Sequence, residues 1–348
     1  MMKSIKILSV CLSVAALVCF ASCSDDKQDA PEPLPPYKPI TPTPDPGGNE
    51  DNGETFTSGM VDLDNGQICI KQDLDRGGSI CYLSRSGEDR SVVNIHDEGR
   101  LIQQSYYAGN SLNRQSEGQS PDWSPWTWNP IQGGNYAGKK ARIVECLRKD
   151  NTLYVKCIPM LWDMNNHEAE AVMEQWTTLD GNVAHVRCRL TCHRTDEIYG
   201  EGIARDQEIP AVYPISALTT LYAYLGNAPF TSGALSTPTV ECLQDGFWGR
   251  YDGNNNPIPQ EKWMAFADAN QWGLGVYSPK AERFLAGRSG FVGGEAMDAS
   301  TAYIAPICTA ALKKNSVMEY DYYLILDKIS TMRSTIYDIH QKVNSNNQ

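Results

Sequence analysis

The sequence is poor in cations and in histidine. Its 348 residues include 30 Lys+Arg against 42 Asp+Glu, and five His, which gives a formal net charge of −12 at pH 7. No run of lysine or arginine occurs, and a chain of this charge repels a phosphate backbone. Nucleic acid is therefore not expected as a partner.

Several motifs of known chemistry are also absent. The chain has no G-x-S-x-G nucleophile elbow, no H-E-x-x-H, no Gly-rich phosphate loop and no dinucleotide fingerprint. The scattered histidines and cysteines lack the spacing of a zinc site, so neither a metal nor a cofactor is expected. The residues that are present, 41% hydrophobic and 9% aromatic, indicate a globular protein.

The N-terminus has the features of a secretory signal at residues 1–22. Lys3 and Lys6 precede an apolar run over residues 7–20, and the small pair Ala21-Ser22 comes directly before Cys23. After residue 22, no stretch is apolar and long enough to cross a bilayer as a helix. An ordinary signal peptide with an incidental Cys23 is the alternative to the lipoprotein signal that we favour.

The residues around Cys23 resemble the lipobox of bacterial lipoproteins, which implies that Cys23 is acylated and anchors the chain. Ser24-Asp25-Asp26 resembles the acidic signal that sends lipoproteins of some glycan-foraging Gram-negative bacteria to the outer face. The resemblance implies a lipid-anchored, surface-exposed protein of the cell outer membrane. It also implies a possible place in a surface glycan-uptake complex.

A tether is predicted over residues 23–55. Eight of the sixteen positions from Pro31 to Pro46 are proline, and residues 47–54 are rich in Gly, Asp, Asn and Glu. Extended polyproline rises about 3.1 Å per residue, so this segment reaches roughly 50 Å. It would hold the domain at residues 56–348 away from the membrane. The eight cysteines of that domain are expected to be mostly buried thiols.

The domain shows the period-two alternation of strands, broken by Gly, Asn and Asp. One hairpin is predicted at residues 142–158, around Asp150-Asn151, and a second at residues 170–193, around Asp180-Gly181. Only residues 330–343 have a helical stripe. The fold class is therefore all-β, a large antiparallel β-sandwich with a short C-terminal helix.

The second hairpin predicts a strip of functional side chains. If Asp180-Gly181 forms the turn, Glu174 faces Arg187 and Trp176 faces His185 on one side of the sheet. A solvated face with ordinary cross-strand ion pairs is an equally good interpretation. Trp176 on an otherwise charged face favours a binding site.

A second group of candidates is the aromatic segment at residues 121–130. It places Trp126 and Trp128 among prolines that exclude a helix, and Asn129 follows. An indole stacks on the apolar face of a sugar ring, and amides bind the hydroxyls. Alternatively, these tryptophans close one end of the sandwich.

Polar residues on both faces of the stretch at residues 94–107 suggest more than a core strand. Gln104 and Tyr107 suit a ligand rich in hydroxyls, and Arg100 suits a carboxylate or sulfate. Capping of turns at a strand edge is the alternative. Two further polar segments contribute Asp163 and Glu208.

The residues Arg76-Gly77-Gly78-Ser79-Ile80, followed by Ser86-Gly87 and Val92-Val93-Asn94, resemble the opening of galactose-mutarotase-like β-supersandwich domains. Such domains occur in mutarotases, glycoside hydrolases and polysaccharide lyases, and they bind sugar on a concave sheet. The resemblance implies a carbohydrate-active protein. His193 and Glu208 are the nearest counterparts of the mutarotase catalytic His and Glu.

Three functions stay open. A glycoside hydrolase, which we favour from the sequence, needs a carboxylate pair drawn from Glu174, Asp163 and Glu208. A polysaccharide lyase would use Tyr107 or His193 as base and Arg100 or Arg187 to neutralise a uronate. A non-catalytic glycan-binding lipoprotein needs only the tryptophans and amides. In each case the expected ligand is a polysaccharide or oligosaccharide.

Overall fold

The protein is described by a computed structural model over residues 53–201, 203–240, 242–243 and 258–345. The predicted signal peptide, Cys23 and residues 23–52 of the predicted tether lie outside these ranges. Within them, no helix is long and apolar enough to cross a membrane. The seven cysteines described are free thiols, and five of them are buried.

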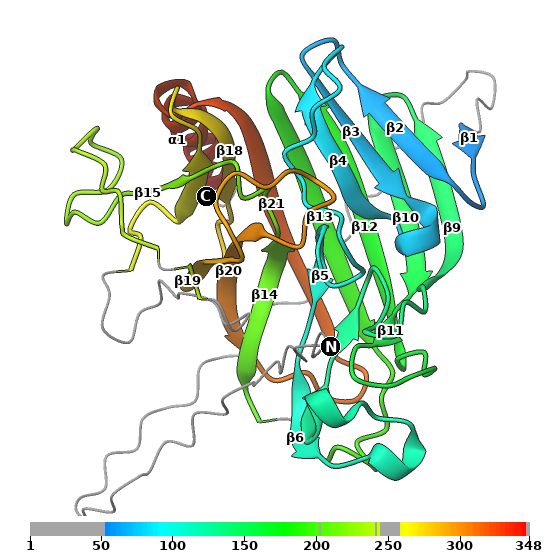
Figure 1. Cartoon of the computed structure of the whole chain (residues 1–348). Coiled ribbons are helices and arrows are strands. Elements are labelled where there is room, and N and C mark those ends of the chain that lie inside the picture. The colour runs from blue at the N-terminus through cyan, green and yellow to red at the C-terminus, as the bar shows by residue number, and fades with distance from the viewer. Residues whose placement is uncertain (1–52, 202, 241, 244–257, 346–348) are drawn as a thin grey trace, which may run out of the picture. The chain divides into compact units, whose positions relative to one another are not determined.

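Two antiparallel sheets form a sandwich, which confirms the predicted all-β class (Figure 1). We call the first sheet A. In spatial order it consists of β1 (Glu54–Thr55), β9 (Arg142–Lys149), β10 (Thr152–Ile158), β12 (Ala171–Asp180), β13 (Val183–Cys192), β21 (Val317–Lys328), β18 (Trp272–Tyr277), β17 (Trp263–Ala267) and β15 (Thr220–Ala223).

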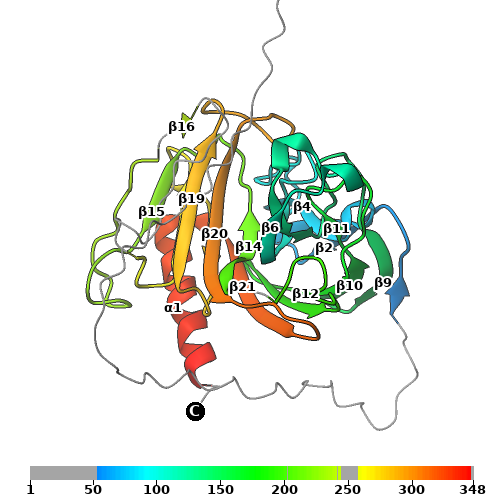
Figure 2. The same cartoon turned by 90° about the horizontal axis from the view of Figure 1, so that it is seen from below.

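The second sheet, sheet B, lies against the first. Its main path consists of β16 (Cys242–Leu243), β19 (Arg283–Ser289), β20 (Thr301–Ala310), β14 (Arg205–Val212), β5 (Ile102–Ser105), β4 (Ser79–Arg85), β3 (Ile68–Asp73) and β2 (Met60–Asp64), with β8 (Pro130–Ile131) and β11 (Met160–Leu161) paired beside it. Among the strands that the structure describes, only the short pair of β16 with β19 is parallel. Figure 2 shows β19, β20 and β14 side by side.

Short elements complete the chain. A separate two-stranded sheet joins β6 (Ala108–Leu112) to β7 (Trp126–Trp128), and the 3₁₀ turns are Leu74–Arg76, Gln115–Glu117 and Pro121–Trp123. The C-terminal helix α1 (Ile329–Ser345) extends slightly beyond the predicted range. Its buried stripe contains Met332, Ile336 and Ile339 as predicted, and this stripe packs on sheet A beside Trp263 and Tyr277.

The main core lies between the sheets, where strand residues alternate between the interior and the outside. In β12, Ala171, Met173 and Gln175 are buried, whereas Glu174 and Trp176 are half-buried and point away from the core. A hydrogen bond of 3.2 Å from Gln104 Nε2 to the Glu174 carbonyl oxygen crosses the interior. It places β5 directly across the sandwich from β12.

The first predicted hairpin is confirmed, because Lys149 pairs with Thr152 across Asp150-Asn151. The predicted turn of the second hairpin is wrong by one residue, because Asp180 pairs with Val183 and the turn is Gly181-Asn182. Gly181 has φ +59°, which suits the glycine that a type II′ turn requires at its first central position. Moving the turn by one residue moves each cross-strand partner by two positions from the predicted one. Because side chains alternate with period two, each keeps its predicted face of the sheet.

Candidate functional site

Glu208 lies in the middle of sheet B, on the face that points away from the sandwich core. It pairs with Ser105 of β5 and with Ile307 of β20, so strands flank it on both sides. A small apolar cluster covers the same face, formed by Ala211, Tyr303, Ala305 and Ile307. Glu208 is 8% exposed. The sheet therefore fixes one carboxylate in a largely apolar setting.

Two tyrosines donate hydrogen bonds to this carboxylate. Tyr107 Oη donates to Glu208 Oε2 at 3.1 Å, and Tyr303 Oη donates to Oε1. Burial, followed by the negative charge of Glu208, raises the pKa of both phenols well above the ordinary value of 10. Both tyrosines therefore stay protonated at neutral pH and act as donors or acids. We call Glu208, Tyr107 and Tyr303 the Glu208 site.

Tyr213 and Arg100 extend the Glu208 site along sheet B. The rings of Tyr213 and Tyr303 lie 5.0 Å apart, and the guanidinium of Arg100 lies 5.5 Å from the centroid of the Tyr213 ring. Arg100 Nη2 also donates to the Ala299 carbonyl oxygen at 3.4 Å, and Arg100 forms an ion pair with Asp97 at 3.8 Å. A cation is therefore held beside the aromatic rings that surround the carboxylate.

Gln103 fixes the loop that carries Arg100. It lies on the same outward face as Ser105, two residues along β5, and its Nε2 donates to the carbonyl oxygens of Glu98 and Arg100 at 2.8 and 2.5 Å. Its Oε1 accepts from the backbone N–H of Gly133 at 2.6 Å. One buried amide thus positions two loops on the outer face of sheet B.

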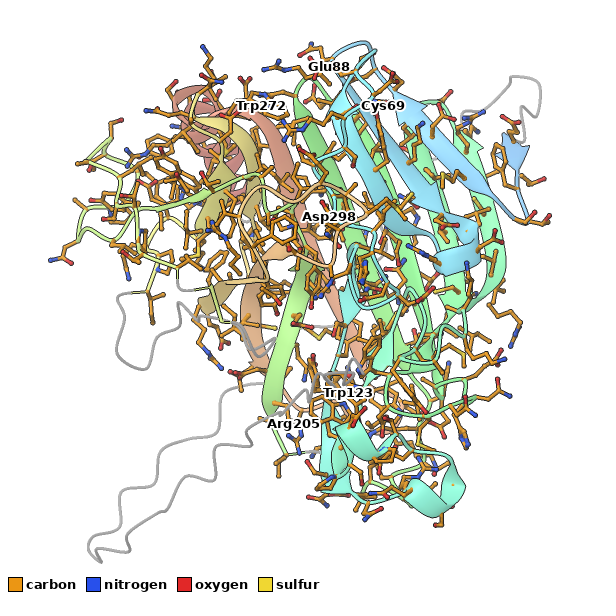
Figure 3. All side chains as sticks on the ribbon, in the orientation of Figure 1. Cys69, Glu88, Trp123, Arg205, Trp272 and Asp298 are labelled. Carbon is orange, nitrogen blue, oxygen red and sulfur yellow. The ribbon has the colours of Figure 1, made fainter. Side chains whose placement is uncertain are left out.

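A tryptophan cluster, formed by Trp123, Trp126 and Trp162, lies beside this loop. The ring of Trp162 packs on Gly99, where a Cβ would lie 2.7 Å from Trp162 Cη2. Trp123 meets Trp162 edge to face at 5.5 Å and meets Trp126 edge to face at 5.1 Å. All three indoles are half-buried. Figure 3 labels Trp123 of this cluster and Arg205, the first residue of β14.

The predicted strip lies on the outer face of sheet A. Glu174 faces Arg189 and Trp176 faces Arg187, which corrects the pairs Glu174–Arg187 and Trp176–His185. Tyr154 Oη donates to Glu174 Oε1 at 2.8 Å. The Trp176 ring lies 5.0 Å from Tyr154, at 33°, with the Arg187 guanidinium 5.5 Å from its centroid on the next strand.

The remaining part of the strip also pairs across strands. His185 Nε2 lies 2.8 Å from Asp321 Oδ1, and the His185 ring stacks on Tyr323 at 4.5 Å. Arg187 Nη2 donates to Glu319 Oε2 at 3.2 Å. These contacts fit a solvated face with cross-strand ion pairs.

Three predicted ligand-binding residues are buried inside the protein. Trp128 is fully buried and donates from Nε1 to Glu170 Oε2, and Gln104 accepts from the hydroxyl of Tyr106 in the core. Asn129, 2% exposed, accepts from Trp126 Nε1 and donates to the Tyr106 carbonyl oxygen. Their contacts are structural, since their polar atoms meet protein partners away from solvent.

The other predicted catalytic residues lie apart from Glu208. Asp163 is fully buried in a loop, where its Oδ2 accepts from Gln119 Nε2 at 2.6 Å, and burial raises the pKa of its carboxyl. His193 follows β13 of sheet A, is exposed, and donates from its backbone N–H to the Glu170 carbonyl oxygen.

Glu174 and Glu208 cannot act together. They point outward from opposite sheets of a sandwich, and stacked sheets lie about 10 Å apart. Paired glycosidase carboxylates are about 5–5.5 Å or 6.5–9.5 Å apart. The structure therefore brings Arg100, Tyr107 and Glu208 to one face and Glu174, Trp176, His185 and Arg187 to the other. Trp126 belongs to the tryptophan cluster, whose Trp162 packs on Gly99.

Four residues of this face are not among the candidates named from the sequence, although Trp123 belongs to the predicted aromatic segment at residues 121–130: Tyr213, Tyr303, Trp123 and Trp162. Tyr303 is 95 positions from Glu208 and reaches it only because β14 pairs with β20. Tyr213 continues β14 beyond the irregular stretch of pairing between Glu208 and Val212. The clustering of Trp123 with Trp126 along the chain was the one available signal.

No family model and no curated protein matches this chain. Among solved structures, it is similar to the Slr1438 protein of Synechocystis at 10% identity and a TM-score of 0.48, covering 79% of this chain and 97% of that one. It is also similar to a galactose mutarotase related enzyme from Lactobacillus acidophilus, at 10% identity and a TM-score of 0.43, with 77% of this chain and 97% of that one covered. The similarity to a putative aldose 1-epimerase from Klebsiella pneumoniae has 10% identity and a TM-score of 0.44, with 82% of this chain and 83% of that one covered.

Proposed function

We propose that this protein is a carbohydrate-active enzyme of the bacterial cell surface whose sugar site is the outer face of sheet B at Glu208. The observation that carries the proposal is the buried carboxylate of Glu208, which accepts hydrogen bonds from Tyr107 and Tyr303 and has Arg100 and Tyr213 beside it. Aromatic rings, a carboxylate and a guanidinium are the groups that bind the C–H faces, hydroxyls and acidic substituents of sugars.

One carboxylate with protonated tyrosines suits proton transfer better than hydrolysis. The carboxylate pair that the sequence offered a hydrolase does not form among the three candidates, because Glu174 lies on the face opposite Glu208 and the Asp163 carboxylate accepts a hydrogen bond inside a buried loop. A polysaccharide lyase needs one base, one acid and a cation that neutralises the uronate carboxylate. Glu208, a tyrosine and Arg100 supply these groups.

The proposed step removes the C5 proton of a uronate unit to Glu208. The C4–O bond then breaks with formation of a C4=C5 double bond, and a tyrosine hydroxyl protonates the leaving oxygen. Tyr107, which the sequence suggested as a base, is the acid in this scheme, because its raised pKa keeps the hydroxyl protonated at neutral pH. Arg100 faces the uronate carboxylate, whose charge grows during proton removal.

A non-catalytic glycan-binding protein is the second candidate. It is favoured because both carboxylate oxygens of Glu208 already accept hydrogen bonds from tyrosine hydroxyls. Such an arrangement can stabilise the sheet without taking part in a reaction. In that case the aromatic face would hold a glycan without chemical change.

The test uses the purified full-length protein and a panel of uronate-containing and neutral polysaccharides. Each mixture is read for ultraviolet-absorbing unsaturated products, new reducing ends and binding. We expect unsaturated products from wild type, a loss of about 10²–10⁴-fold in Glu208→Gln, and no loss in the matched variant Glu174→Gln. Reducing ends without ultraviolet absorbance would contradict the lyase, and binding without turnover would support the second candidate.

The proposal includes the membrane anchor. Cys23 would carry the lipid and the proline-rich segment would hold the domain away from the outer membrane, where a partner in glycan uptake could reach it. Labelled palmitate should enter the wild-type chain and be absent from Cys23→Ser. Protease added to whole cells should cleave the wild-type protein if it faces outward.

A further inference from the structure

The tryptophan cluster contacts the loop that ends at Arg100, so it lies near the Glu208 site without belonging to it. Trp162 packs on Gly99, the next residue carries the guanidinium over Tyr213, and Tyr213 contacts Tyr303. Gln103 holds this loop on the outer face of sheet B. The cluster and the carboxylate are therefore linked along one side of the molecule.

The ring geometry of the cluster differs from that of the aromatic residues on sheet A. Trp123 meets its two neighbours at 74° and 85°, so these rings meet edge to face and do not stack on one another. On sheet A, Trp176 lies between Tyr154 and the Arg187 guanidinium, and His185 stacks on Tyr323 at 11°. The His185 ring therefore stacks face to face on a protein ring, whereas the three half-buried indoles of the cluster meet edge to face.

The local structure keeps the indoles in place. Pro121–Trp123 forms a 3₁₀ turn that Ser120 caps, with its side chain accepting from the Asp122 N–H. Trp126 donates from its indole Nε1 to Asn129 Oδ1 at 3.2 Å, and the backbone N–H of Trp162 donates to the Asn129 carbonyl oxygen at 2.9 Å. A rigid aromatic surface loses little entropy when it binds.

We infer that Trp123, Trp126 and Trp162 form a distal sugar-binding subsite, so that the ligand of the Glu208 site is an extended oligosaccharide. This inference rests on the proposed function, because it assigns a second contact to the same glycan. One sugar unit occupies the Glu208 site, and a unit further along the chain stacks on the tryptophan cluster. Chain length then determines affinity.

The test measures binding by titration calorimetry with the full-length protein. The probes are oligogalacturonates and gluco-, manno- and xylo-oligosaccharides of one to six units. We expect affinity in at least one series to rise about tenfold or more with length. Trp123→Ala and Trp162→Phe should remove most of that gain while leaving the affinity for the shortest bound probe within about twofold. Trp176 is a half-buried tryptophan of the other face, so Trp176→Ala is the matched control. It should change neither the affinity for the shortest probe nor the gain with length.

The outcomes separate this inference from the proposed function. If affinity does not rise with length, or if the two variants weaken short and long probes equally, the subsite is refuted, although loss of turnover in Glu208→Gln would still support the Glu208 site. If none of the probes binds, both proposals fail. Thermal unfolding of each variant checks that it is folded. If Trp123→Ala destabilises the loop, Trp162→Phe still tests the subsite, because it keeps an aromatic ring in the cluster.

Discussion

The buried ion pair between Glu261 and Arg333 attaches α1 to sheet A, and Glu261→Gln should destabilise the protein strongly. Glu261 is fully buried and Arg333 is 12% exposed. The carboxylate accepts from Arg333 Nη2 at 2.8 Å, from Tyr337 Oη at 2.6 Å and from Trp263 Nε1 at 2.9 Å. The backbone N–H of Phe230 donates to it as well.

Breaking one partner of a buried pair costs about 3–5 kcal/mol, because the other charge stays buried without compensation. At roughly 2.1 cal/mol/K of unfolding entropy per residue, this loss corresponds in a domain of this size to a fall in Tm of roughly 5–8 °C. Glu295→Gln is the matched control, because it breaks a two-point ion pair with Arg90 in which both side chains are about half exposed. That exposed pair should contribute less than about 1 kcal/mol.

The dependence on pH has a definite sign. Burial alone would raise the pKa of Glu261, but the bonds from Arg333, Tyr337 and Trp263 outweigh burial and lower it below the ordinary value of 4.5. The contribution of Glu261 is therefore complete above about pH 4.5 and disappears as the pH falls through the lowered folded pKa.

Urea unfolding from pH 7 down to pH 3 measures this dependence. The gap in free energy of unfolding between wild type and Glu261→Gln should be constant above about pH 5 and shrink below it. A loss no larger than that of Glu295→Gln, or a gap that widens in acid, would refute the reasoning.

Three further changes have definite expectations. Asp163→Asn should raise the free energy of unfolding at pH 7, because burial raises the pKa of this carboxyl and makes its ionised form costly in the folded protein. The difference from wild type, measured by urea unfolding, should shrink as the pH falls and the wild-type carboxyl becomes protonated. Gly99→Ala should destabilise by about 1–3 kcal/mol and reduce the length-dependent glycan affinity, because its Cβ would displace Trp162; unchanged calorimetry would argue against that displacement. Gly181→Ala should cost about 1 kcal/mol in thermal unfolding, because φ +59° is strained for alanine.

The local pattern of the sequence determines much of the fold. Alternation identified the strands and the buried face of β12, and the stripe of Met332, Ile336 and Ile339 identified α1. The turn position in the second hairpin was harder to predict, because Gly181 fits either of two adjacent two-residue turns. The error left the faces unchanged because side chains alternate with period two.

The site was less predictable, because it depends on which strands become neighbours. Glu208 and Tyr107 are separated by 101 positions, and pairing of β14 with β5 and β20 brings them together with Tyr303. Burial was the second difficulty. The sequence alone does not distinguish Trp126, half-buried in the cluster, from Trp128, two residues later and inside the core.

The most direct test of where the sugar binds is a crystal structure of the Glu208→Gln variant soaked with the tightest-binding oligosaccharide of the panel. We expect a sugar ring against Tyr213, within hydrogen-bonding distance of Arg100 and of the side chain at position 208, with the sugar chain running toward Trp162 and Trp123. A sugar on the outer face of sheet A, against Trp176 and Tyr154, would contradict it.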